Sequence, residues 1–201
     1  MRKIIWLIIP IFIFLIIYSW PDSESNQHYL EEIHKQIDNR NKYLAYNESS
    51  PFNQFKLNYE APTYYPIDEN YKVNAQVERI KERDIISLGT SDGKEETYIK
   101  YAWLSFSLKG KSYKLVVLKP NSIDSETLFC GFADATSGLS TYGGGRYLDV
   151  VIGKSNKTVI DFNLAYNPYC AYVSDYSCPF PPTENILDIE IFAGELNYKP
   201  K

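Results

Sequence analysis

Apolar and polar positions alternate with a period of two along most of the chain after residue 66, as in β-strands that bury one face. The stretch 73–80 shows this clearly, because polar residues separate Val73, Ala75 and Val77. Further stretches of this kind are 84–88, 97–108, 112–118, 128–132, 148–152, 158–162 and 186–192. Lys109-Gly110 predicts a tight hairpin turn between two of them. Short strands without helices between them predict an antiparallel β-barrel-like or β-sandwich domain.

A helical period precedes the strands. In residues 27–46, Leu30, Ile33, Ile37 and Leu44 lie near helical spacing, which predicts one N-terminal helix. The cluster 47–51 (NESSP) interrupts this spacing and ends the helix. The predicted fold class is therefore mostly β, or α+β by strict count, with one helix before the sheet.

An uncharged apolar stretch, 4–20, follows Arg2 and Lys3 at the N-terminus. It is at the short end of what spans a membrane core of about 30 Å. A cleaved signal peptide ends in small residues, whereas Tyr18 and Trp20 are bulky and suit the lipid headgroup region. We therefore expect an uncleaved transmembrane signal-anchor, with the N-terminus cytoplasmic and the domain extracytoplasmic, in the periplasm or at the cell surface. A cleaved signal, the alternative, exports the domain as well.

The 201 residues divide into an anchor at 1–20, a linker and helix at 21–46, and a β-rich domain at 47–201. The formal net charge of −4 argues against a nucleic-acid partner, which requires a basic face. The 18 tyrosines and 10 phenylalanines favour strands, where aromatic rings pack on the pleated surface. The expected partners are the membrane and either a small anionic or sugar-like ligand or another protein.

Two stretches, 134–146 and 163–185, are too long and irregular for the strand pattern, and long loops in compact domains are usually functional. The runs 134–149 (DATSGLSTYGGGRYLD), 161–172 (DFNLAYNPYCAY) and 178–185 (CPFPPTEN) resemble the signature of domain of unknown function family 1684, found in bacteria and archaea. The similarity covers roughly residues 30–197, with Tyr169 where the family often has a second proline. The resemblance implies no activity, because none is established for the family.

The segment 143–146 (GGGR) admits two interpretations. In the first, backbone amides of Gly143, Gly144 and Gly145 bind an anion together with the guanidinium of Arg146. In the second, the glycines form a tight turn with positive φ angles, and Arg146 forms an ion pair inside the protein. The aspartates available for that ion pair are Asp134, Asp149 and Asp161.

Tyrosines crowd both loops, where their rings suit stacking on a sugar or lipid headgroup but pack equally well into the open end of a barrel. We expect the two loops to come together at one end of the domain and form a pocket. The candidate ligand-binding residues are Asp134, Tyr142, Gly143, Gly144, Gly145, Arg146, Asp161, Asn163, Tyr166, Asn167, Glu184 and Asn185.

Histidine-dependent catalysis is not expected in the β domain, because His28 and His34 both lie in the predicted helix. The usual zinc site also lacks ligands, so neither a metal nor a cofactor is expected. A hydrolase-like enzyme remains open, in which two carboxylates act with Arg146 as electrostatic stabiliser. Its candidate carboxylates are Asp134, Asp149, Asp161 and Glu184. A binding or assembly module is favoured, since a tyrosine-rich site without histidine suits recognition better than turnover.

Cys170 and Cys178 bracket a short segment and are expected to form a disulfide outside the cytoplasm. A reduced pair with a metal-binding or redox role is the alternative. Cys130 alternates with Leu128 and Phe132 on one predicted strand, so we expect it to be a buried core thiol.

Overall fold

The computed structural model describes residues 23–121 and 128–199. Helix α2 (Ser23–Tyr46) ends at the residue expected from the sequence, and helix α3 (Pro51–Gln54) follows it. The chain divides into two units after Lys35, and the sheet belongs to the second, Gln36–Lys201. The part of the chain that the structure describes has no helix long and apolar enough to cross a membrane. The expected anchor, 4–20, lies outside the described residues.

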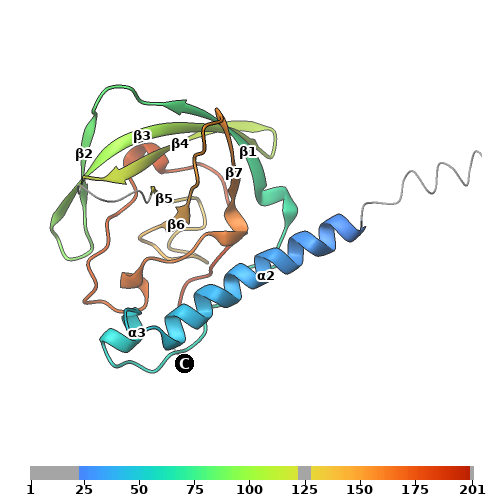
Figure 1. Cartoon of the computed structure of the whole chain (residues 1–201). Helices are drawn as coiled ribbons and strands as arrows, with labels where there is room; N and C mark the ends of the chain where they lie inside the picture. Colours follow the sequence, from blue (N-terminus) through green and yellow to red (C-terminus); the bar gives the residue numbers. More distant parts are fainter. Residues whose placement is uncertain (1–22, 122–127, 200–201) are drawn as a thin grey trace, which may run out of the picture. The chain divides into compact units, whose positions relative to one another are not determined.

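One antiparallel sheet forms the framework of the second unit (Figure 1), in the strand order β6-β5-β4-β3-β1-β7 with β2 paired to β3. The strands are β1 (Lys72–Arg79), β2 (Ile85–Gly89), β3 (Glu95–Leu108), β4 (Lys111–Pro120), β5 (Phe129–Phe132), β6 (Arg146–Asp149) and β7 (Lys157–Asp161). The predicted hairpin turn is confirmed, since Lys109 and Gly110 join β3 to β4 with φ angles of 49° and 78°. β6 begins two residues earlier than predicted because Arg146 pairs with Phe132 of β5.

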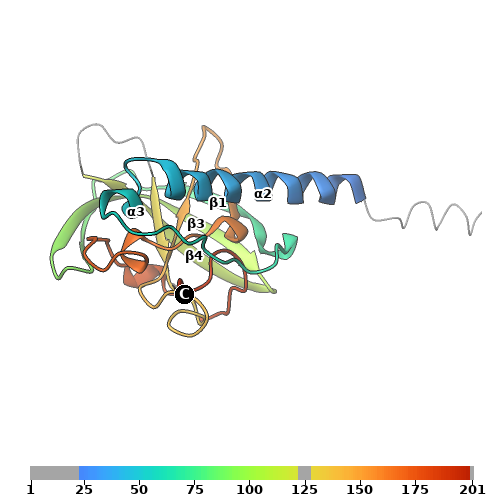
Figure 2. The ribbon, with the colours of Figure 1, turned by 90° about the horizontal axis from the view of Figure 1, so that it is seen from below.

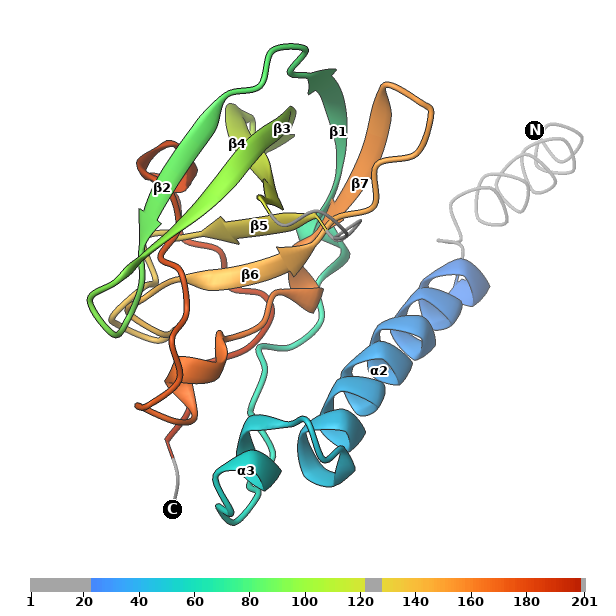
Figure 3. The same cartoon turned by 60° about the vertical axis from the view of Figure 1, so that its left-hand side comes forward.

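The sheet is a half-barrel. Figure 3 shows β5 and β6 running across the direction of β1, β2 and β3. The direction changes where β4 meets β5, because these strands share a single residue pair, Leu118 with Phe129. A register shift between Lys100 and Ala102 interrupts the pairing of β3 with β4, and such bulges increase the local twist.

The core confirms most of the predicted alternation. β1 alternates buried and exposed residues along most of its length. β4 does not, because residues 115–118 are all buried. Leu115 and Val117 belong to the main core, whereas Val116 and Leu118 pack in a second cluster on the other side of the strand. Cys130 is fully buried in the main core, as expected.

The orange and red segment after β7 packs against the sheet without extending it (Figure 2). Its short 3-10 turns are η2 (Phe162–Leu164), η3 (Tyr169–Ala171) and η4 (Thr183–Asn185); η1 (Glu69–Tyr71) precedes β1. The strand predicted at 186–192 is wrong, because this stretch makes only an isolated bridge between Ile186 and Ala133. Its apolar residues Leu187 and Ile191 enter the core, and backbone groups of Ala133 and Ala135 supply its hydrogen bonds.

Candidate functional site

The two long loops contact each other. The hydroxyl of Tyr142, in the first loop, lies 3.6 Å from the sulfur of Cys170, in the second. The backbones of Tyr147 and Tyr166 also exchange two hydrogen bonds, of 2.8 and 3.0 Å. The loops therefore approach each other as expected, but the individual candidate residues have different surroundings.

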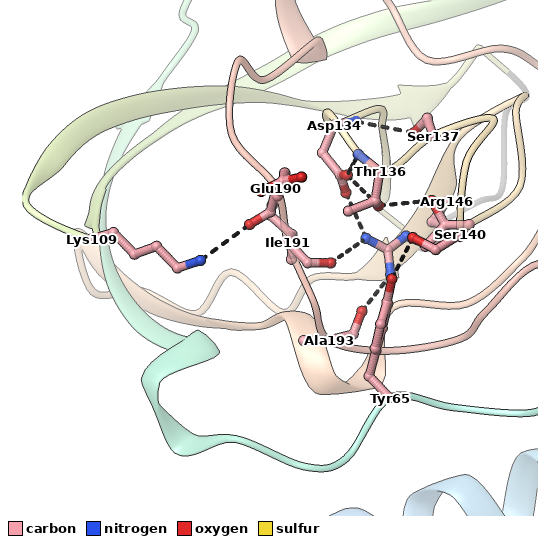
Figure 4. A network of polar contacts seen from close by, with 11 residues as sticks. Tyr65, Lys109, Asp134, Thr136, Ser137, Ser140, Arg146, Glu190, Ile191 and Ala193 are labelled. Carbon is pink, nitrogen blue, oxygen red and sulfur yellow. Dashed lines mark hydrogen bonds and ion pairs between the residues drawn. The ribbon is translucent and has the colours of Figure 1, made fainter.

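The guanidinium of Arg146 contacts only groups inside the protein in the view of Figure 4. Its Nη2 lies 2.6 Å from Oδ2 of Asp134, and both side chains lack exposed surface. The guanidinium also donates hydrogen bonds to the carbonyl oxygens of Ile191, at 3.2 Å, and Ala193. Burial lowers the pKa of Arg146, and the charge of Asp134 opposes this shift. The internal ion pair is thus the interpretation that the geometry supports, and it ties the first loop to the segment after β7.

Two of the three adjacent glycines are explained by close packing. Gly145 has a φ of 84°, and a Cβ there would lie 2.6 Å from the carbonyl oxygen of Phe132. A Cβ at Gly144 would lie 2.6 Å from the ring of Tyr142. At Gly143 the nearest atom would be 3.6 Å away, which is an ordinary contact. Of the three glycines, only Gly145 has the positive φ expected of a tight turn, whereas Gly144 is explained by its contact with Tyr142.

Two candidate asparagines bind backbone groups. Asn185 is fully buried; its Oδ1 accepts from the amide of Val116 at 2.7 Å, and its Nδ2 donates to the carbonyls of Val116 and Gly131 at 2.9 and 2.7 Å. Asn163 similarly accepts from the amide of Asp68 and donates to its carbonyl, at 3.0 and 2.9 Å. Both amides act as substitutes for a neighbouring strand, which is a structural role.

The four carboxylates proposed for catalysis have separate partners. Asp134 pairs with Arg146, and Glu184 lies 3.0 Å from Nζ of Lys100. A hydrogen bond from its own backbone and the contact with Lys100 lower the pKa of Glu184. The remaining two are Asp161, which accepts from the amide of Asn163 at 3.0 Å, and Asp149, which accepts from the hydroxyl of Tyr166 at 2.7 Å.

Cys170 and Cys178 are both free thiols, so the disulfide expected from the sequence is absent from the structure. The two residues are nevertheless neighbours, because the amide of Cys170 donates a hydrogen bond of 3.2 Å to the sulfur of Cys178. This hydrogen bond holds the pair together in the reduced form.

A cavity of about 180 Å³ lies beside the second loop. Arg40 of α2 forms one wall, with its guanidinium carbon 3.9 Å from the centre of the Tyr166 ring. Tyr64 comes from the segment before β1, and Asp149 from the end of β6. The lining residues are Gln36, Ile37, Arg40, Tyr64, Asp149, Leu164 and Tyr166.

A buried carboxylate, Glu195, supports Arg40. Oε2 of Glu195 lies 3.7 Å from Nε of Arg40 and accepts a hydrogen bond from the amide of Asn167 at 3.0 Å. Oε1 accepts from the hydroxyl of Tyr172 and from Nδ2 of Asn167, the latter at 3.2 Å. Nη2 of Arg40 donates to the carbonyl of Asn167 at 3.2 Å. Burial raises the pKa of Glu195, and Arg40 with these hydrogen bonds opposes the shift.

Three buried polar atoms in this network have no hydrogen-bond partner among the described residues. They are Nε of Arg40, the hydroxyl oxygen of Tyr64 and Oδ1 of Asn167. Buried polar atoms of native proteins are nearly always satisfied by protein, water or ligand. Arg40 and Tyr64 line the cavity, so a molecule held there is placed to supply partners.

Asp149, Tyr166 and Asn167 were candidates from the sequence, whereas Arg40, Tyr64 and Glu195 were not. One signal was present: Arg40 falls at helical spacing within the apolar series Ile33, Ile37 and Leu44. A charged residue in an apolar stripe needs a buried partner. No comparable signal marks Glu195, whose surroundings come from the irregular segment after β7.

Comparisons with known proteins confirm the resemblance found in the sequence. The model for the family described as protein of unknown function (DUF1684) matches residues 58–196. Among solved structures, the chain is similar to the solution NMR structure of an uncharacterised protein of Haloarcula marismortui, with a TM-score of 0.67 and 31% identity. That likeness covers 86% of this chain and 96% of the other. No curated protein matches the chain.

Proposed function

Because the chain belongs to the DUF1684 family of proteins of unknown function, we propose its function from its own cavity: it is an extracytoplasmic binding module for a small, hydroxyl-bearing, sugar-like molecule. The observation that carries this proposal is the pair of unpartnered polar atoms on two residues that line the cavity, Arg40 and Tyr64. A bound molecule that satisfies them removes the cost of their burial, about 1–3 kcal/mol for each unsatisfied group.

The unpartnered atoms specify the chemistry of the ligand. Nε of Arg40 is a donor, and the hydroxyl of Tyr64 is both a donor and an acceptor. Hydroxyl groups meet both requirements, because each donates and accepts. The charge of Arg40 is already opposed by Glu195, so the ligand needs no charge of its own.

The size of the cavity limits the ligand. Drug-sized ligands occupy pockets of roughly 300–1,000 Å³. The cavity here, at about 180 Å³, suits a monosaccharide or a single terminal group of a longer molecule. Leu164 and Ile37 contribute apolar wall, as is general for small-molecule sites, and this wall suits the carbon skeleton of a sugar.

The proposal includes the membrane anchor at 4–20. Its support is the uncharged sequence between Lys3 and Pro21, together with the two basic residues before it. With that orientation, the cavity is exposed to molecules outside the cytoplasm.

Saturation-transfer difference NMR on the full chain, with glucose and N-acetylglucosamine as probes and acetate as a charged comparison, tests this function. We expect transfer to at least one sugar and its loss in Tyr64→Phe, which keeps the ring but removes the unpartnered hydroxyl. Tyr113→Phe is the matched control, because the hydroxyl of Tyr113 is also buried and unpartnered but Tyr113 is not among the cavity's lining residues. Absence of transfer to both sugars, or equal transfer in Tyr64→Phe, would contradict the proposal.

A further inference from the structure

Cys178 is fixed to the hairpin that joins β2 to β3. The amide of Ser91 donates to the carbonyl of Cys178 at 2.9 Å, and the amide of Cys178 donates to Oγ of Ser91 at 3.1 Å. Oγ of Ser91 in turn donates to the carbonyl of Tyr176 at 2.8 Å. The backbone of Cys178 therefore has a defined position, which the loop cannot change without breaking these bonds.

Cys170 lies in η3, with its backbone turned toward that sulfur. Its amide donates to Sγ of Cys178 at 3.2 Å, and the hydroxyl of Tyr142 lies 3.6 Å from its own Sγ. Cys170 thus has a second thiol and a phenol beside it. Both groups are able to donate a hydrogen bond to a thiolate.

The two thiols differ in access and acidity. Cys178 is only 6% exposed, whereas Cys170 is half-buried. The hydrogen bond from the Cys178 thiol, aided by Tyr142, lowers the pKa of Cys170 to about 6 even though burial acts against it. The same contact and burial raise the pKa of Cys178. The more accessible sulfur is also the one with the lowered pKa, and the thiolate is the reactive form of cysteine.

We propose that Cys170 and Cys178 form a thiol–disulfide exchange site, in which Cys170 is the attacking thiol and Cys178 the resolving thiol. The substrate class is a small-molecule disulfide, RSSR. The thiolate of Cys170 attacks one sulfur of RSSR, forms a mixed disulfide with it and releases RS⁻.

Cys178 then completes the exchange. Its thiol loses a proton, attacks the Cys170 sulfur of the mixed disulfide, and releases the second RS⁻. In total the two cysteines lose two electrons and two protons, and RSSR becomes two thiols. Because the backbone of Cys170 contacts the sulfur of Cys178, this second step proceeds within one short loop.

Cys130 provides an internal comparison. It is fully buried in the main core, and burial raises its pKa to about 12. It is therefore expected to resist both disulfides and alkylating agents as long as the protein is folded.

The test uses the reduced full chain and oxidised glutathione, followed by acid quenching and peptide mass spectrometry. We expect an internal Cys170–Cys178 disulfide in the unmodified sequence, reversed by excess reduced glutathione. Cys178→Ser should retain glutathione on Cys170, whereas Cys170→Ser should leave Cys178 at least tenfold less modified in the same time. Equal capture by Cys178, no oxidation, or a disulfide that excess glutathione fails to reduce would each overturn the proposal.

The pH profile of iodoacetamide alkylation supplies a second test that needs no cysteine variant. The reaction of Cys170 should have its midpoint near pH 6, where its thiolate forms, and Cys130 should not react. Tyr142→Phe should move the midpoint upward, because it removes a hydrogen-bond donor from the sulfur. A midpoint near the ordinary cysteine value of about 8.5 would overturn the assignment of Cys170 as the attacking thiol.

Discussion

The hydroxyl of Tyr172 donates a hydrogen bond to Oε1 of Glu195, a carboxylate with no exposed surface. A buried carboxylate is tolerated only where charges and hydrogen bonds replace the water it has lost. Here Arg40 supplies the charge, and Tyr172 with Asn167 supplies the hydrogen bonds. Glu195 therefore joins the second long loop to Arg40 of α2, which forms one wall of the cavity.

Tyr172→Phe should lower the free energy of unfolding by about 1.5–3 kcal/mol, because it leaves a buried carboxylate with one hydrogen bond fewer. Tyr64→Phe is the matched comparison, since the hydroxyl that it removes lies near Arg40 but makes no hydrogen bond of good geometry with the described residues. Its effect in the absence of ligand should stay within about 0.5 kcal/mol or be stabilising. Urea unfolding followed by circular dichroism measures both, and equal losses in the two variants would contradict the assigned network.

Glu195 should make the stability of the protein depend on pH. Burial raises the pKa of Glu195 in the folded state above its usual value of 4.5, so the folded state binds this proton more tightly than the unfolded state. The contribution of Glu195 to stability is therefore fully present below about pH 4.5 and is lost as the pH rises through the raised value.

The measurement is a series of urea unfolding curves on the unmodified sequence and on Glu195→Gln, from about pH 4.5 upward. The stability of the unmodified protein should fall with pH more steeply than that of the glutamine variant. Asp92 and Glu184 have lowered pKa values, mainly from hydrogen bonds, and affect stability below this range in both proteins. If stability fell with pH equally in the two proteins, the pKa of Glu195 would be the same in the folded and unfolded states, which contradicts the prediction.

The strands were predictable because their pattern is local. Val73, Ala75 and Val77 show which face of β1 is buried, and Lys109-Gly110 fixes the hairpin with its positive φ angles. The stretch 186–192 has a similar alternation but forms no strand. Its partner backbone belongs to Ala133 and Ala135 in a loop, and no pattern within the stretch itself distinguishes that partner from a strand.

The functional site was less predictable than the strands, because most candidate residues in the two sequence motifs stabilise the fold. Asn163, Asn185 and Arg146 were expected at a pocket, yet each satisfies backbone or charged groups inside the protein. The cavity depends on Arg40 and Tyr64, which lie far from both motifs in sequence. Only the folded chain brings them to Tyr166, so spacing within the motifs carried no information about them.

Arg146→Met should destabilise the protein by about 3–5 kcal/mol, because it leaves the carboxylate of Asp134 buried without its charge partner. The double variant Asp134→Leu/Arg146→Met should recover much of this loss, since it removes both buried charges together. Thermal unfolding of the two variants measures the difference. If the double variant were no more stable than Arg146→Met, the ion pair would not be the reason for the arginine.

Asn185→Ala should cost at least about 3 kcal/mol, because three buried backbone groups lose their partner and each unsatisfied group costs about 1–3 kcal/mol. These groups are the amide and carbonyl of Val116 and the carbonyl of Gly131. They lie where β4 and β5 no longer pair, and the side chain of Asn185 supplies the hydrogen bonds that a neighbouring strand would make. The amide of Val116 should consequently exchange with deuterium much faster in this variant. Asn74→Ala, on the exposed face of β1, is the control and should change stability by no more than about 0.5 kcal/mol. Unchanged exchange at Val116 would mean that β4 keeps its hydrogen bonds without Asn185, and that the asparagine of this motif serves a purpose other than closing the sheet.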